Sequence, residues 1–278
     1  MLASAMGLGS VPDGVREGIA SSPDGVPIRY QVAGQGSPAI VLIHCWLCDQ
    51  HLWDAVVPVL VRKHTVVTLD LAGHGGSGGT REAWTIEAFG GDAKAVVDEL
   101  GLDRVILVGH SMGGLVAVET ARRISTKLAG LVPVDILLDV EEKMKPEEVV
   151  AYLKPFRADF KAAAEKFIRD YMFVPSSDPV LIERVVTQVK AGQPEMAVAA
   201  LEAAWKYDAR AGLREIKAPI TAINAEKFPT NLEGNRRCAP QFDAAIMKGV
   251  GHYLMLEDPA RFTELLLGIV NDMSARKV

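Results

Sequence analysis

A serine between two glycines is the clearest chemical signal in this chain. Residues 105–114 read VILVGHSMGG, in which four apolar residues predict a buried strand and residues from 112 onward predict a helix. On a tight strand-to-helix turn, the G-x-S-x-G pattern holds its serine in strained backbone geometry and exposes the Oγ atom. Ser111 is therefore a candidate nucleophile. The helix that begins at Met112 would point free N–H groups at a developing oxyanion.

A serine hydroxyl needs a base that accepts its proton, and an imidazole serves best when its other nitrogen is held by an acceptor. Among the six histidines, His252 is the one on a loop after the last predicted strand, with Gly249 and Gly251 beside it. We therefore expect His252 to act as general base and then as general acid. The alternative is a loop histidine without a chemical role. The other histidines lack this context: His44, His51, His64, His74 and His110.

The elements that must position these residues alternate between strand and helix. Strands are expected at 26–32, 39–43, 65–69, 105–108, 131–134, 219–223 and 242–247, and helices at 49–63, 85–100 and 112–124 and from 259 onward. This order predicts a parallel sheet with right-handed crossovers. The active site of such a sheet lies beyond the carboxyl ends of its strands, where Ser111, Trp46 and Asp135 are all expected.

Residues 141–207 interrupt this alternation. Apolar side chains recur there at three- and four-residue steps from Val149 to Tyr171, which predicts a helix bent at Pro155. Two more helices are expected at 179–192 and from 194 to about 205. Helices without intervening strands lie outside the sheet. We therefore expect a core made of 21–140 and 208–278, an inserted segment at 141–207, and a loosely held arm at 1–20.

The GHSMGG stretch in this setting resembles the α/β-hydrolase family, and the resemblance covers most of residues 27–270. It implies an α/β-hydrolase fold, with a mostly parallel central sheet flanked by helices and with 141–207 as an inserted helical cap over the strand ends. After the strand at 39–43, the family usually has His-Gly-x, where this chain has His44-Cys45-Trp46. By this resemblance the N–H groups of Trp46 and Met112 form the oxyanion hole. The Trp46 ring itself could simply be packed in the core.

The acid that orients His252 is open to more than one reading. The family usually supplies it after the seventh strand, where this chain has Ala225-Glu226-Lys227-Phe228 without an aspartate. Some members, haloalkane dehalogenases among them, place the acid after the sixth strand, the position of Asp135. We predict Asp135, with Glu226 as the main alternative and Asp139 as a third. An aspartate at 135 could also serve only to hold loops together.

The resemblance and the serine nucleophile together predict hydrolysis of a carboxylic ester or lactone through an acyl-enzyme on Ser111. Dehalogenases and epoxide hydrolases of this fold need a carboxylate in place of the serine, so those reactions are disfavoured. Cofactor-free perhydrolases and C–C bond hydrolases share the serine, and the fold also serves non-catalytic small-molecule receptors. An apolar cap predicts a small-molecule substrate with an apolar acyl or aryl portion, of which N-acyl homoserine lactones are one example.

A rival site is the sequence H-C-x-x-C-x-x-H formed by His44, Cys45, Cys48 and His51, which could be a redox pair or a metal site. A zinc site usually draws a second ligand pair from farther along the chain, so we expect the cysteines to be small apolar fillers. The glycine-rich loop at 71–79 lacks a Walker-type lysine, so it predicts no phosphate cofactor. We expect neither a cofactor nor a metal.

Bulk properties limit the remaining functions. The net charge of −5 is spread without long runs, which argues against a nucleic-acid partner. Three cysteines argue against a disulfide framework and fit a reducing compartment. The first 15 residues have neither a basic start nor a long apolar run, so we expect a cytoplasmic protein without a membrane span. Nothing in the sequence indicates an oligomeric state.

Overall fold

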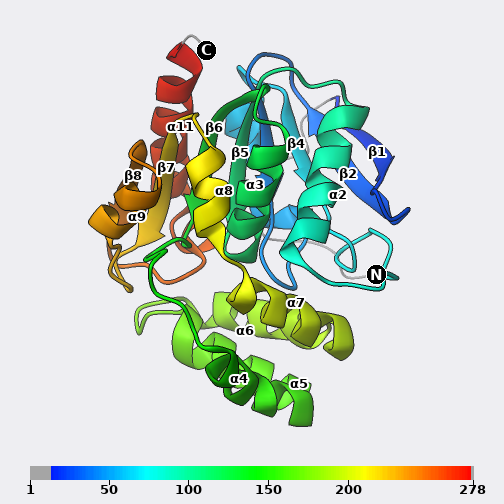
Figure 1. The fold of residues 1–278 in the computed structure, drawn as a ribbon, viewed down its shortest axis with the longest axis vertical. Coiled ribbons are helices and arrows are strands. Elements are labelled where there is room, and N and C mark those ends of the chain that lie inside the picture. The colour runs from blue at the N-terminus through cyan, green and yellow to red at the C-terminus, as the bar shows by residue number, and fades with distance from the viewer. Residues whose placement is uncertain (1–13, 277–278) are drawn as a thin grey trace.

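One twisted sheet runs through the centre of the computed structural model, which describes residues 14–276 (Figure 1). Within these residues the sheet has eight strands in the order β1-β2-β4-β3-β5-β6-β7-β8. Strands β1 and β2 run antiparallel to their neighbours, and the others pair in parallel. The strands are β1 (Arg16–Ser21), β2 (Pro27–Ala33), β3 (Ala39–Ile43), β4 (Val66–Leu69), β5 (Val105–His110), β6 (Leu128–Val134), β7 (Ile220–Ala225) and β8 (Phe242–Met247).

The central strands are the solid apolar runs of the sequence. Every residue of β3, β5 and β6 is buried, because helices cover both faces of the sheet there. Crossover connections bring the carboxyl ends of these parallel strands to one edge of the sheet. The expected α/β fold with a mostly parallel sheet is therefore confirmed.

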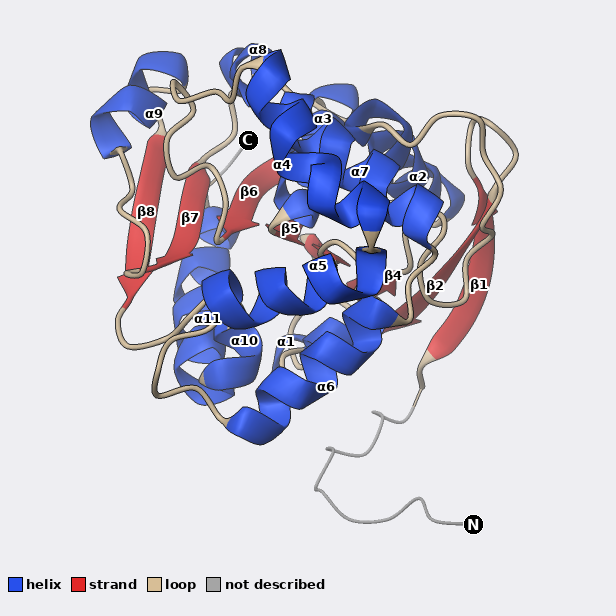
Figure 2. Cartoon of the chain, turned by 90° about the horizontal axis from the view of Figure 1, so that it is seen from below, coloured by secondary structure: helices blue, strands red, loops and turns tan. Residues whose placement is uncertain are grey.

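Helices cover the sheet on two sides. Figure 2 shows α2 and α3 on one side of the sheet and α11 on the other, and α8 packs against α3. The elements of the core are η1 (Gln50–Trp53), α1 (Val57–Leu60), α2 (Ile86–Glu99), α3 (Met112–Arg123), α8 (Ala209–Glu215), α9 (Leu232–Cys238), α10 (Leu254–Glu257) and α11 (Pro259–Ala275).

A helical insertion follows β6 and ends before β7, as the sequence predicts. Its first helices lie together beyond one edge of the sheet, and α8 leads the chain back to the core (Figure 1). They are α4 (Pro146–Ala158), α5 (Phe160–Phe167), the π-helix η2 (Ile168–Met172), α6 (Pro179–Lys190) and α7 (Pro194–Lys206). Strands β5 and β6 point their carboxyl ends toward this insertion.

Three local expectations are wrong. The arm predicted at 1–20 lies outside the described residues up to residue 13, but Arg16–Ser21 forms edge strand β1. Its residues are mostly exposed, so hydrophobic alternation is weak, and pairing with β2 supplies the order.

The helix expected at 49–63 is instead the short 3₁₀ helix η1 followed by α1. Pro58 lies in the first turn of α1, where its missing N–H costs least, and it cannot continue a helix that begins at η1. The single helix expected through Pro155 is also wrong. Helix α4 continues through Pro155 to Ala158 and breaks at Asp159, whose side chain accepts the Ala162 N–H and caps α5.

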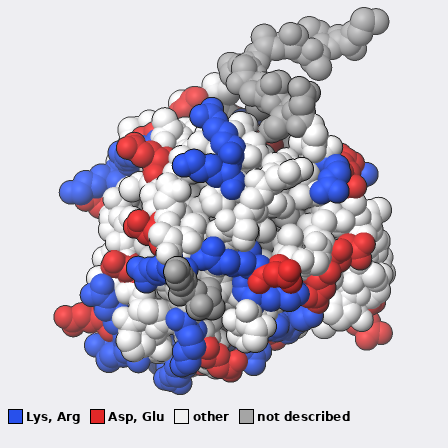
Figure 3. All heavy atoms as spheres, turned by 90° about the horizontal axis from the view of Figure 1, so that it is seen from above, with Lys and Arg blue, Asp and Glu red and all other residues white. Residues whose placement is uncertain are grey.

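Surface charge of both signs is mixed on the face opposite the insertion, where basic and acidic side chains lie side by side (Figure 3). Many of the ion pairs are exposed, such as Lys94 and Lys127 with Asp98. Such pairs contribute little stability individually. No helix in residues 14–276 combines the length and apolarity needed to cross a membrane.

Candidate active site

Ser111 lies on the turn between β5 and α3 with φ 53° and ψ −121°. This positive φ is strained for a residue with a side chain, so the neighbouring structure must hold it. The Ser111 N–H donates to the Val134 carbonyl at 2.8 Å, and the Ser111 carbonyl accepts the Gly114 N–H at 2.8 Å. The predicted strained strand-to-helix turn is therefore present at this serine.

The glycines around the serine are needed for close packing. A Cβ atom at Gly109 would lie 2.1 Å from the Gly113 carbonyl oxygen, and one at Gly113 would lie 2.3 Å from the His44 carbonyl oxygen. One at Gly114 would lie 2.4 Å from the Ile136 side chain. Helix α3 can therefore approach β5 and the loops after β3 and β6 only because these three positions lack side chains.

His252 and Asp135 form a buried hydrogen-bonded pair at the same edge of the sheet. The Nδ1 atom of His252 lies 2.6 Å from Asp135 Oδ2, and the other carboxylate oxygen accepts the Ala225 N–H at 2.7 Å. The His252 side chain is 12% exposed and that of Asp135 is 1% exposed. Because an ionised carboxylate only accepts hydrogen bonds, it holds the proton on Nδ1 and leaves Nε2 free to act as a base.

The two alternative acids lie elsewhere. Glu226 is 56% exposed at its side chain and pairs with Lys248 at 3.6 Å. Asp139 accepts a hydrogen bond from Asn231 at 2.8 Å and another from the Glu141 N–H. Of the three carboxylates weighed from the sequence, the structure brings Asp135 to His252.

Backbone contacts bring Ser111 beside this pair. Its N–H bonds to Val134, which directly precedes Asp135, while the adjacent His110 contacts His252. The His110 and His252 rings lie 4.5 Å apart between centroids. The residues expected to act together therefore converge from the ends of β5, β6 and β8.

His110 is a residue that sequence reasoning set aside. Its Nε2 lies 2.8 Å from the His252 carbonyl oxygen, so Nε2 carries the hydrogen and donates it. Burial lowers the pKa of His110 well below its ordinary value, and the nearby His252 acts in the same direction. His110 therefore stays neutral and anchors the backbone of His252. Its position before a serine is no signal for this role, because the contact spans 142 residues.

The loop after β3 brings Trp46 to the same edge of the sheet. Leu47 has φ 55°, so this loop is strained next to Trp46. The N–H of Met112 is the first of α3 and has no carbonyl partner within the helix. In the described part of the chain, the Trp46 N–H makes no backbone hydrogen bond either. Both groups are thus available as donors.

The Trp46 ring packs into the helical insertion. It makes edge contacts with Phe156, Phe160 and Phe167, with centroids 6.2–6.3 Å apart. Its Nε1 donates to the Ala197 carbonyl of α7 at 2.8 Å. The ring therefore joins the loop after β3 to the insertion, which agrees with the packed-core alternative for the side chain.

The four residues of the rival site, His44, Cys45, Cys48 and His51, are not arranged to bind one metal ion. Cys45 and Cys48 are buried free thiols with their sulfur atoms 2.6 Å apart, and burial raises the pKa of Cys45. Both ring nitrogens of His44 are occupied, by the Cys45 carbonyl and the Leu71 N–H. His51 is exposed and pairs with Asp54 instead. Among residues 14–276, no group of His, Cys, Asp or Glu is arranged as a set of metal ligands.

Comparison with known proteins agrees with this geometry. A family model described as "Alpha/beta hydrolase family" matches residues 40–265. The chain belongs to the α/β-hydrolase family.

Individual relatives are distant in sequence, but they align over nearly the whole of both chains. A pimeloyl-[acyl-carrier protein] methyl ester esterase of Klebsiella pneumoniae strain 342 is 26% identical, over 87% of this chain and 97% of that protein. A thermophilic esterase from Thermogutta terrifontis superimposes with a TM-score of 0.81 at 23% identity, covering 94% of this chain and 100% of that one. The enol-lactonase from Burkholderia xenovorans LB400 has a TM-score of 0.80 at 22% identity, with 91% and 100% covered.

A cavity of about 470 Å³ lies between the core of the hydrolase and its insertion. Leu115 is one turn along α3 from Ser111, and Ile136 and Leu137 directly follow Asp135. Met144 and Trp205 line the same cavity. Its walls combine these apolar side chains with the charged ones of Glu142, Lys143, Glu148 and Asp208.

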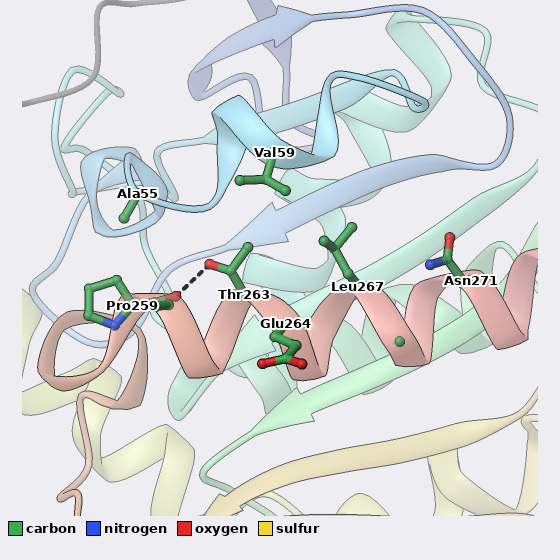
Figure 4. A pocket seen from close by; sticks show the side chains of 9 residues that line it. Ala55, Val59, Pro259, Thr263, Glu264, Leu267 and Asn271 are labelled. Atoms are coloured by element: carbon green, nitrogen blue, oxygen red, sulfur yellow. Dashed lines mark hydrogen bonds between the residues drawn. The ribbon is translucent and has the colours of Figure 1, made fainter.

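The groove drawn in Figure 4 lies away from these residues. Its volume is about 570 Å³, and it runs along α11 from Pro259 to Asn271, with Ala55 and Val59 opposite. Glu264 is its one titratable lining residue. Among the described residues, no histidine, cysteine or serine lines the groove.

Replacing Gly109 with alanine tests the packing of the turn at Ser111. Because the new Cβ would meet backbone at 2.1 Å, we expect G109A to lower the free energy of unfolding by about 3 kcal/mol or more. Gly268 of α11 is the matched control, since nothing lies within 4 Å of its added Cβ and alanine favours helices. Urea unfolding should show G268A unchanged or slightly stabilised. Equal stability of the two variants would contradict the close approach.

Buried neutral histidines predict loss of stability in acid. Burial lowers the pKa of His44 to about 4, so between about pH 6.5 and about pH 4 the unfolded chain binds a proton that the folded chain does not. The free energy of unfolding should fall by up to about 3 kcal/mol across this window. We expect a shallower pH dependence in H44Q, measured by urea unfolding, with H51Q at an exposed histidine as the matched control. Equal slopes in H44Q and wild type would contradict this origin.

Proposed function

We propose that this hydrolase cleaves a carboxylic ester or a lactone through an acyl-enzyme on Ser111. The observation that carries the proposal is the 2.6 Å hydrogen bond from His252 to the buried Asp135, beside the strained turn of Ser111. A carboxylate on Nδ1 makes Nε2 a useful base and stabilises the imidazolium that forms when it accepts a proton.

In the proposed reaction, Ser111 Oγ attacks the carbonyl carbon while His252 Nε2 takes the hydroxyl proton. The negative charge moves to the carbonyl oxygen, where the N–H groups of Trp46 and Met112 donate to it. Collapse of this intermediate breaks the bond to the leaving alkoxide, which receives the proton from His252. A water molecule then attacks the acyl-enzyme by the same steps, so that the acid is released and Ser111 is restored.

The apolar side chains of the cavity between core and insertion, among them Leu115, Ile136 and Leu137, support a substrate with an apolar acyl portion. The cavity borders Ile136 and Leu137, next to the orienting Asp135, and lies under the insertion. Pockets that bind small organic substrates combine apolar walls with polar groups that fix the orientation of the substrate. The K. pneumoniae relative is named as an esterase and the B. xenovorans neighbour as an enol-lactonase, so open and cyclic esters are both reasonable candidates.

Removing the nucleophile tests the proposed chemistry. We expect the wild type to hydrolyse p-nitrophenyl esters and S111A to lose kcat by about 10³-fold or more, because no hydroxyl remains to form the acyl-enzyme. Ser125 is exposed, so S125A is the matched control and should retain full activity. A fluorophosphonate should label S125A and leave S111A unlabelled. A wild type that binds small esters without turnover or labelling would indicate a receptor instead.

A pair of amide variants tests the acid. We expect D135N to lower kcat by about 10³–10⁴-fold, because an amide no longer holds the productive tautomer of His252. E226Q removes an exposed carboxylate of the same charge and should stay near wild type. Steady-state kinetics on one ester measures both. Large loss in E226Q with little in D135N would contradict the assignment.

A further inference from the structure

The end of the π-helix η2 presents three consecutive carbonyl groups to the core. Lys227 Nζ donates to the Tyr171 carbonyl at 2.6 Å and to the Phe173 carbonyl at 2.7 Å. Between them, the Met172 carbonyl accepts the backbone N–H of His252 at 2.7 Å. The last carbonyls of a helix lack partners within it, so groups from outside must satisfy them. Here Lys227 and the backbone N–H of His252 donate to these carbonyls.

Lys227 occupies a segment that also contacts the acid. It lies two residues after Ala225, whose N–H is bound by Asp135. Burial lowers the pKa of Lys227, and the carboxylates of Glu257 and Asp135 oppose this shift. Bonds from an ammonium group are stronger than those between neutral groups, so two of them fix the carbonyls on either side of Met172. In many relatives an acid is expected in this segment, and here a lysine contacts the insertion.

Three hydrogen bonds hold His252, one to its ring and two to its backbone. Its ring is bound by Asp135, its carbonyl by His110, and its N–H by Met172 of the insertion. The first two contacts come from the ends of core strands. The third depends on where the insertion places one carbonyl, and Lys227 binds the carbonyls on either side of it.

We propose that Lys227 is a positioning residue that couples the helical insertion to the base His252, by fixing the carbonyls on both sides of Met172. This inference rests on the proposed role of His252. Without the ammonium group, the Met172 carbonyl loses its fixed place and the His252 N–H loses its partner. The base then samples orientations from which Nε2 no longer reaches the nucleophile, so the chemical step slows more than substrate binding weakens.

Two readouts test the coupling in K227M, which removes both donors and the charge. Hydrogen exchange measured by mass spectrometry should show the amides of 251–254 exchanging about tenfold faster than in wild type. On an ester, kcat should fall about tenfold while KM stays within about threefold. K227R retains a charged donor and should recover most of kcat.

Lys248 provides the matched control. It is an exposed lysine that pairs with Glu226, so K248M makes the same chemical change without touching the insertion. K248M should match the wild type in exchange and in kcat. If K227M does not fold, K227Q keeps donor N–H groups without the charge and is compared in the same way.

The following results would overturn the proposed role of Lys227. Unchanged exchange at 251–254 in K227M overturns the coupling. Faster exchange with a kcat equal to that of K248M overturns the positioning of the base, and so does a K227R variant no better than K227M. A wild type without esterase activity contradicts the proposed function, while the exchange comparison still tests whether Lys227 holds the insertion to His252.

Discussion

The hydrogen bond between Asp135 and His252 is the constraint on which the rest of the site depends. It joins residues 117 positions apart, and it forms only if the ends of β6 and β8 lie one strand apart at the same edge of the sheet. Strand β7 fills the gap between them, and its Ala225 N–H binds the second oxygen of Asp135. The carboxylate is thus satisfied on both oxygens in a buried position, where an unpaired charge would be costly.

Backbone strain gathers at the same edge. Leu47, Ser111 and Asp135 follow β3, β5 and β6, and all three have positive φ although none is glycine. Each such residue costs on the order of 1–3 kcal/mol, so the fully buried strands before them must offset that cost. The rigid parallel sheet thereby holds the three loops that carry Trp46, Ser111 and Asp135 at one edge. A more loosely packed sheet would let these loops relax.

Local sequence predicts those parts of the site whose geometry is local. The GHSMGG stretch lies at the junction of a predicted strand and a predicted helix. The sequence therefore predicts the strained turn at Ser111 and the glycines that it requires. The choice between Asp135 and Glu226 is not local, because both follow core strands and only the pairing of β6, β7 and β8 decides which one faces His252. Resemblance to members of the family with an acid after the sixth strand favours Asp135. The 2.6 Å contact between Asp135 and His252 agrees with that choice.

Hydrogen bonds to backbone groups cannot be predicted from residue types, because every residue has a backbone carbonyl. The donation from His110 to the His252 carbonyl and the two bonds from Lys227 to the insertion have no motif, so sequence reasoning missed both residues. Edge strand β1 was missed because its residues are mostly exposed, and the break at Asp159 because the nearby Pro155 is the stronger local signal. Tertiary packing decides each of these cases.

The most direct test of the account is a crystal structure of the hydrolase after reaction with an alkyl fluorophosphonate. The account predicts phosphorus bonded to Ser111 Oγ, with His252 Nε2 beside that oxygen and the phosphoryl oxygen within hydrogen-bonding distance of the Trp46 and Met112 N–H groups. Phosphorus on another residue would contradict the account, as would a phosphoryl oxygen directed away from both N–H groups.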